Sequence, residues 1–152
     1  NTIDFDGSIN KLVNRSIIST WGGEVDISFR YFSDLVLGAH ISHARANIRG
    51  TNEKLKNRVK WKGGMNAAWV FDKHSSMSLS LLRVGQVLSS SIPTGDRILG
   101  AYTTIDITGN WVPNDFWKMT GSIDNLFGAD VREGVGFAIR GPIARISIRY
   151  QY

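Results

Sequence analysis

The sequence predicts an all-β fold, and more specifically an antiparallel transmembrane β-barrel segment of about seven strands. The first observation is strict alternation, which is clearest near the end of the sequence, over residues 144–152 of the stretch 142–152, where every second side chain is apolar and those between are charged or polar. Successive side chains of a strand point to opposite faces, so this pattern predicts a two-faced strand. The second is that no helical period competes, and no run reaches the 18 apolar residues of a membrane helix.

Composition narrows the function classes. The 152 residues are 42% hydrophobic, which fits one ordinary domain, and include 5 Trp, a residue that collects at membrane interfaces. The absence of Cys excludes disulfides and Cys-ligated metals. The net charge of +5 is spread along the chain at strand spacing and not clustered, so nucleic acid is not an expected partner.

The alternating segments follow one another along the chain. The expected strands are 16–31, 35–48, 59–71, 76–88, 99–111, 117–124 and 142–152. The alternation is lost near Leu82, Arg83 and Val84, where we expect a β-bulge. Residues 1–13 are weakly patterned and carry no export signal, so we expect a mature chain or a piece of a longer one. They represent either the end of an earlier strand with a polar loop or a hidden eighth strand.

The connections between these strands alternate in length. Short turns are expected near 33–34, 72–75 and 113–115, and longer loops near 49–57, 89–97 and 128–141. Transmembrane barrels have short periplasmic turns and long extracellular loops, which is the same asymmetry. Single-chain bacterial barrels have an even number of strands, so seven strands imply either the eighth strand or membership of a larger barrel.

One stretch resembles a known family. Gly121–Phe127, reading Gly-Ser-Ile-Asp-Asn-Leu-Phe, is similar to the penultimate-strand motif of TonB-dependent outer-membrane receptors, and Arg132-Glu133 and Gly136-Phe137 resemble its continuation. The family then shows Pro-Gly-Arg, whereas this chain has Arg-Gly-Pro at 140–142. Upstream, residues 21–26 resemble the family's Gly-x-Glu strand and residues 57–61 its Asn-Arg-Pro strand opening, with Val in place of Pro.

The resemblance implies a larger assembly. In that family a barrel of about 22 strands surrounds an N-terminal plug, so residues 1–152 are expected to be the C-terminal portion of the barrel, with no plug domain in this chain. The implied function is TonB-energised uptake of a scarce nutrient, such as a ferric siderophore or cobalamin, across the bacterial outer membrane. The implied partners are outer-membrane lipid, the remaining barrel and plug in the same or a separate chain, and the TonB complex acting through the plug. The terminal pattern Ile146, Ile148, Tyr150 and Tyr152 resembles the signal read by the barrel-insertion machinery.

Ten charged residues fall on the predicted inward faces and are expected to face the lumen: Glu24, Asp26, Arg30, Lys60, Lys62, Asp106, Lys118, Asp124, Arg145 and Arg149. The main interpretation is a network of wall charges that pair with one another or with a plug. Ligand contact is expected from Arg132 and Arg140 in the last long loop, where cations suit an anionic ligand such as a metal chelate.

Seven aromatic residues are predicted to form interfacial girdles on the apolar face: Trp21, Trp61, Trp69, Trp111, Trp117, Tyr150 and Tyr152. The alternative is that they fill the core of a soluble barrel.

No covalent chemistry is expected, so the chain is predicted not to be an enzyme and to carry no cofactor. The glycine-rich stretches lack phosphate-cradle spacing. His40 and His43 point to opposite faces of a regular strand and His74 sits in a turn, so no metal site is predicted. The Ser and Asp residues select no catalytic trio.

Two other classes remain open. One is a self-contained small outer-membrane barrel that acts as a channel or structural protein. The other is a soluble lipid-binding or enzymatic barrel with its apolar faces inward. Strand count separates the first from a receptor segment, and detergent dependence separates both from the soluble barrel.

Overall fold

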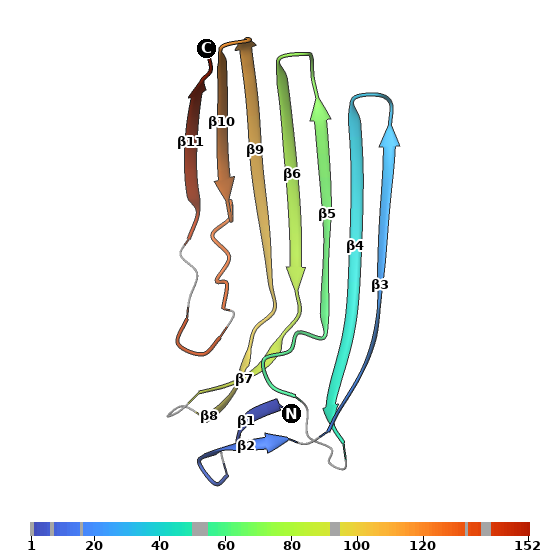
Figure 1. Ribbon diagram of the computed structural model, residues 1–152, viewed down its shortest axis with the longest axis vertical. Helices are drawn as coiled ribbons and strands as arrows, with labels where there is room; N and C mark the ends of the chain where they lie inside the picture. The colour runs from blue at the N-terminus through green and yellow to red at the C-terminus, as the bar shows by residue number, and fades with distance from the viewer. Residues whose placement is uncertain are drawn as a thin grey trace.

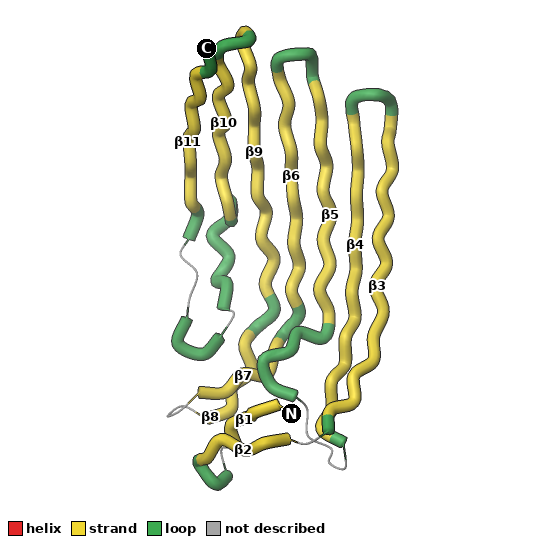
Figure 2. Tube along the Cα trace, viewed as in Figure 1, coloured by secondary structure: helices red, strands yellow, loops and turns green. Residues whose placement is uncertain are grey.

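The computed structural model describes residues 2–6, 8–15, 17–49, 55–91, 95–132, 134–137 and 141–152. Within these residues the chain forms β-strands in three antiparallel sheets (Figures 1 and 2). No helix in this part of the chain is long and apolar enough to cross a membrane.

The largest sheet has seven antiparallel strands in the order β11-β10-β9-β6-β5-β4-β3. The strands are β3 (Ile18–Tyr31), β4 (Leu35–Ile48), β5 (Trp61–Val70), β6 (Ser75–Val84), β9 (Tyr102–Asn114), β10 (Trp117–Asp124) and β11 (Ile143–Tyr150). The predicted all-β class and seven-stranded antiparallel sheet are therefore confirmed. The sheet is not closed into a barrel, because β3 and β11 are edge strands in the part of the chain that is described.

Two short hairpins accompany this sheet. The first joins β1 (Thr2–Asp6) to β2 (Lys11–Arg15), and β1 pairs with β2 alone. Residues 1–13 therefore add no eighth strand to the large sheet among the described residues. The second hairpin joins β7 (Val87–Ser91) to β8 (Gly95–Leu99), across the expected loop 89–97 and the adjoining ends of the expected strands 76–88 and 99–111.

The predicted β-bulge near Leu82, Arg83 and Val84 is wrong. The register of β6 with β5 and with β9 runs without a shift as far as Val84. The alternation fails for another reason: Val84 lies on the polar side of the sheet but is only 6% exposed, beside the segment that follows β6. A register shift occurs instead between Trp117 and Met119, where β10 pairs with β9.

The connections fall at two ends of the large sheet, as Figure 1 shows. Three short turns, at 32–34, 71–74 and 115–116, form the turn end. Three long connections, between β4 and β5, β6 and β9, and β10 and β11, form the loop end. The predicted alternation of short and long connections is thus present in the fold.

The turns are held by side-chain acceptors. The carboxylate of Asp72 accepts a hydrogen bond from the backbone N–H of His74 at 2.6 Å. The side-chain oxygen of Asn114 accepts from the N–H groups of Phe116 and Trp117 at 3.0 and 3.1 Å. Asp and Asn favour such turns because their short side chains reach the backbone two or three residues on.

The buried apolar core is small and lies at the loop end. Its members are Ile48, Val84, Val87, Leu99 and Val131. The two broad faces of the large sheet are therefore left without a packed layer over them among the described residues. An isolated sheet of this kind needs something else to cover its apolar face.

Candidate functional site

The strand register divides the large sheet into two chemically distinct faces. Residues directly opposite one another on neighbouring strands share a face, so one row runs from Tyr31 through Leu35 and Trp69 to Met77. The side that contains this row, every second residue of each strand, is called the apolar face. The other side, which contains Asp26 opposite His40, is called the polar face.

Nine of the ten charges predicted to face a lumen lie on the polar face: Glu24, Asp26, Arg30, Lys62, Asp106, Lys118, Asp124, Arg145 and Arg149. Lys60 lies one residue before β5, outside the paired strands. The structure thus brings charges that are far apart in sequence onto one surface.

The apolar face is exposed. Ile27, Met65 and Ile146 are 63%, 62% and 84% exposed, although all three are strand residues with neighbours in register. Contiguous exposed apolar surface of this extent is rare on soluble monomers and marks a protein or membrane contact.

Aromatic rings gather at both ends of the apolar face. Near the turn end the ring of Trp69 lies 4.5 Å from that of Phe71, and the ring of Trp117 lies 4.9 Å from that of Tyr150. Trp111 lies on the same face, opposite Met119. Tyr152, predicted as a strand residue, lies beyond the end of β11 at Tyr150.

Near the loop end, Trp21 and Trp61 flank His43. The ring centroid of His43 lies 5.0 Å from that of Trp21 and 4.2 Å from that of Trp61. The three side chains come from β3, β4 and β5 and form one aromatic row across the apolar face.

Three of the charges on the polar face have partners. Asp124 forms an ion pair with Arg145 on the adjacent strand. The carboxylate of Asp106 accepts a hydrogen bond from the backbone N–H of Asn125 at 2.7 Å. The remaining members, Glu24, Asp26, Arg30, Lys62, Lys118 and Arg149, form no ion pair with one another among the described residues.

At the loop end the connection before β5 is fastened to the β7–β8 hairpin. The hydroxyl of Ser89, which is 2% exposed, donates to the side-chain oxygen of Asn57 at 2.6 Å. The N–H of Asn57 donates to the carbonyl of Leu88 at 2.7 Å, and Lys56 pairs with Asp96 at 2.8 Å. These contacts hold two loop-end segments together.

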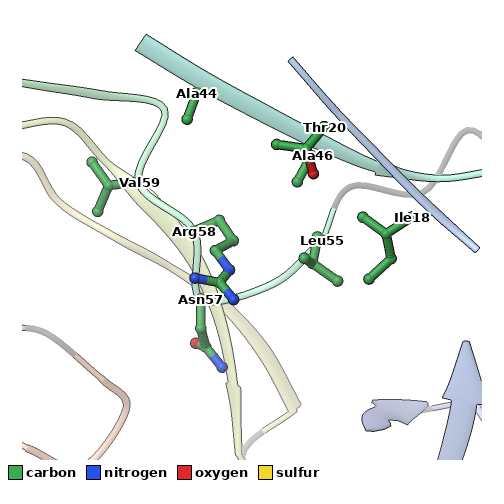
Figure 3. Close-up of a pocket in the computed structure, with 8 residues that line it drawn as sticks. All are labelled: Ile18, Thr20, Ala44, Ala46, Leu55, Asn57, Arg58 and Val59. Atoms are coloured by element: carbon green, nitrogen blue, oxygen red, sulfur yellow. The ribbon is translucent and has the colours of Figure 1, made fainter. Parts of the chain in front are cut away.

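A groove of about 600 Å³ lies between this fastened connection and the polar face of β3 and β4 (Figure 3). Its walls are formed by Ile18, Thr20, Ala44, Ala46, Leu55, Asn57, Arg58 and Val59. Arg58 supplies the positive charge in an otherwise neutral lining.

A smaller cavity of about 200 Å³ brings two predicted residues together. Lys62 of the polar face and Arg132 of the last long connection both line it, together with Tyr102 and several apolar residues. Arg132 also lines a neighbouring cavity of about 280 Å³ with Arg97. The loop end therefore concentrates positive charge around Arg132.

Arg132 is partly neutralised by Asp130. Its Nε lies 3.1 and 3.0 Å from the two carboxylate oxygens of Asp130, and its terminal nitrogen lies 2.7 Å from one of them. These hydrogen bonds, together with the charge of Asp130, raise the pKa of the Arg132 guanidinium. Arg140, the other residue predicted to contact ligand, lies outside the described residues.

The histidines do not converge. His40 lies on the polar face opposite Gly64, His43 lies on the apolar face opposite Trp61, and Nδ1 of His74 donates to the carbonyl of Val112 at 2.7 Å. No cluster of three or more metal-ligating side chains occurs in the part of the chain that the structure describes.

Sequence reasoning missed the residues that shape the loop end. Asn57, Ser89, Arg97 and Tyr102 are scattered over residues expected to be loops or strand ends, so no local spacing joins them. The sequence pattern marks Asn57 only as the first residue of the strand opening at 57–61. In the structure it has a left-handed φ of 57°, a conformation in which Asn is enriched, so its residue type was the available signal.

No protein-family model matches the chain, and a search of curated proteins finds no similar sequence.

Proposed function

We propose that this chain is a segment of an outer-membrane β-barrel whose apolar face contacts lipid and whose polar face lines the interior. The observation that carries the proposal is the exposed apolar face, bounded by aromatic rows near both ends. Transmembrane barrels have an outward apolar band flanked by aromatic girdles. The alternative, a soluble barrel with its apolar side inward, predicts the opposite labelling pattern in the cysteine scan described below.

The spacing of the aromatic rows supports a membrane role. Trp61 and Trp69 lie eight residues apart on β5, and Trp21 and Tyr31 lie ten apart on β3. At a rise of about 3.3 Å per residue these separations are roughly 26 and 33 Å along the strand. A strand tilt of about 40° reduces them to roughly 20 and 25 Å, close to the apolar band of a barrel.

The edges of the sheet favour a larger barrel over a self-contained one. In a seven-stranded antiparallel sheet the first and last strands run in the same direction, and β3 and β11 do so in Figure 1. Direct closure of β3 onto β11 would need a parallel pair, whereas single-chain bacterial barrels are antiparallel throughout. The chain therefore needs further strands.

We further propose that the complete protein is a TonB-dependent receptor that takes up a scarce nutrient such as a ferric siderophore or cobalamin. This step rests on the motif at Gly121–Phe127 and its continuation. In this reading the turn end is periplasmic and the loop end is extracellular. The positive charge around Arg132, Arg97 and Lys62 would then face an anionic ligand at the mouth.

The orientation of the two faces can be tested by cysteine scanning, because the chain has no native Cys. We expect Ile27→Cys and Ile146→Cys to react with a membrane-embedded maleimide, and Asp26→Cys and Arg145→Cys to react with a charged, water-soluble thiosulfonate. Ile27 and Asp26 are adjacent on β3, and Ile146 and Arg145 are adjacent on β11, so each strand provides its own comparison. The opposite labelling pattern, or none that alternates, would exclude the barrel.

Transport needs a separate test in cells that carry the full-length gene. Uptake of labelled ferric chelates and of cobalamin should fall when the gene is deleted and when a protonophore collapses the membrane potential. Uptake that depends on the gene but not on the energised inner membrane would exclude a TonB-dependent receptor and leave a passive barrel.

A further inference from the structure

The apolar face carries charge at one end only. Across the seven strands, the residues of this face include no acidic side chain. Its two cations are Arg45, opposite Trp21, and Arg83, opposite Gly63 and Thr103. Both belong to the loop-end half of the sheet.

The two arginines lie on either side of the loop-end pair His43 and Trp61. Counted along their strands, Arg45 lies ten residues from Leu35 and Arg83 lies six residues from Met77, two residues that share one row of the register. His43, between Trp21 and Trp61, lies eight residues from that same row. The distance from that row falls from ten residues at Trp21 on β3 to six at Arg83 on β6, so cations and aromatic rings form one diagonal belt. It is defined here as the loop-end belt: Trp21, His43, Arg45, Trp61 and Arg83.

One guanidinium of the belt is oriented by the sheet. A terminal nitrogen of Arg83 donates to the hydroxyl of Thr103 on β9 at 2.8 Å. This contact uses part of the guanidinium fork and directs the group along the surface, where its remaining N–H groups stay exposed. Arg45 is exposed as well. A planar guanidinium with free N–H groups matches a phosphate in a bidentate arrangement.

We propose that the loop-end belt binds the phosphate of an anionic membrane lipid. The inference rests on the proposed membrane orientation and names the headgroup chemistry of the leaflet at the loop end. Three features argue for a lipid. The cations lie on the face proposed to meet acyl chains, and Trp21 and Trp61 belong to the same belt and suit a role as interfacial anchors. No acid competes for the arginines on that face.

The test uses the whole chain refolded in dodecyl maltoside micelles and titrated with soluble dihexanoyl phosphatidic acid or dihexanoyl phosphatidylcholine. Tryptophan fluorescence reports binding. We expect tighter binding of phosphatidic acid, and a loss of about 25-fold in its affinity for R45Q/R83Q, because each basic side chain near an anionic surface contributes roughly a factor of five. The single variants should each lose about fivefold, so the inference stays testable if the double variant does not fold.

K118Q/R149Q is the matched control, because it removes the same charge from the polar face. It should bind phosphatidic acid as the parent chain does. Equal losses in both double variants, or no loss in R45Q/R83Q, overturn the proposal. Inorganic phosphate distinguishes a lipid headgroup site from a free-phosphate site. If inorganic phosphate displaces phosphatidic acid at a concentration similar to that of the lipid, the site binds free phosphate and the lipid assignment is overturned.

A parallel measurement separates this inference from the proposed function. In vesicles of phosphatidylcholine with brominated acyl chains, tryptophans of the apolar face should be quenched. Absence of quenching in the parent chain contradicts the membrane orientation itself. Quenching together with unchanged lipid selectivity in R45Q/R83Q removes only the headgroup site.

Discussion

Lys118 and Arg149 lie directly opposite one another on β10 and β11, on the polar face near the turn end. Both side chains are exposed, and neither forms an ion pair in the described part of the chain. Two like charges in register repel and weaken the pairing of their strands. The arrangement is therefore unfavourable in this chain alone and would suit a carboxylate supplied by another part of the proposed barrel.

Replacing one cation tests this repulsion. We expect Arg149→Glu to stabilise the isolated chain by roughly 0.5 kcal/mol, because it converts a repulsive pair into an attractive one across the strands. Urea unfolding in detergent micelles measures the change. Ser78→Glu is the control, since the exposed Ser78 lies on the same face opposite the neutral Ala68 and Thr108 and should gain nothing. A loss of stability in Arg149→Glu alone would contradict the prediction.

The turn at Asp72 should make stability depend on acid. The hydrogen bond from the backbone N–H of His74 is the main cause that lowers the pKa of Asp72, with help from Ser75. Because the folded pKa is below the unfolded value of 3.8, the carboxylate stabilises the fold above that pH, and the benefit disappears as pH falls through the folded pKa.

The comparison of Asp72→Ala with the parent chain measures this effect. The variant should unfold at lower urea than the parent at pH 6, and the gap should close as the pH drops below about 4. Asp115→Ala, in another turn of the same end, controls for loss of an exposed charge. A gap that is constant with pH would show that the carboxylate's charge is not involved.

The sequence predicted most of the large sheet because each strand carries apolar side chains on one face and polar side chains on the other. The row Tyr31, Leu35, Trp69 and Met77 follows from alternation alone once strands are paired in order. Polar-face charges follow from the same period. Alternation is a local property of each strand. It therefore predicts which residues share a face of the sheet, but not which loop residues contact one another.

The loop end could not be predicted for the same reason. The hydrogen bond from Ser89 to Asn57 joins residues 32 apart in the sequence, and the residue spacing within either segment does not predict it. Val84 reads as an error in the strand pattern, yet it is buried by loop residues on the polar side. Arg83 lies in the same stretch, where the alternation is lost in the sequence. Its position on the apolar face is shown by its register with Gly63 and Thr103.

The two faces should respond in opposite ways to a new charge. Leu79, on the apolar face, lies beside Ser80, on the polar face, near the middle of β6. We expect Leu79→Arg to cost about 2–4 kcal/mol when the chain inserts into vesicles, because an outward arginine near the bilayer midplane is poorly solvated. Ser80→Arg should cost much less. Insertion measured by resistance to protease tests both, and equal effects would contradict a lipid-facing side.

Asn125 is the residue of the segment Gly121–Phe127 whose structural role can be tested most directly. It is 6% exposed and has a left-handed φ of 52°, and its side-chain amide both donates to and accepts from the backbone of Ala129, at 3.0 and 2.9 Å. Its own N–H is bound by Asp106. The motif residue therefore closes the turn after β10 and ties it to β9.

Two substitutions separate the causes of this stability. Asn125→Gly removes the two side-chain hydrogen bonds but tolerates the backbone angle, so we expect a loss of about 2 kcal/mol. Asn125→Ala adds the left-handed strain and should lose about 1–2 kcal/mol more. Asp106→Asn keeps an acceptor for the N–H and should lose less than Asp106→Ala. Urea unfolding ranks the four variants, and equal losses for Gly and Ala at position 125 would show that the backbone conformation does not hold this turn.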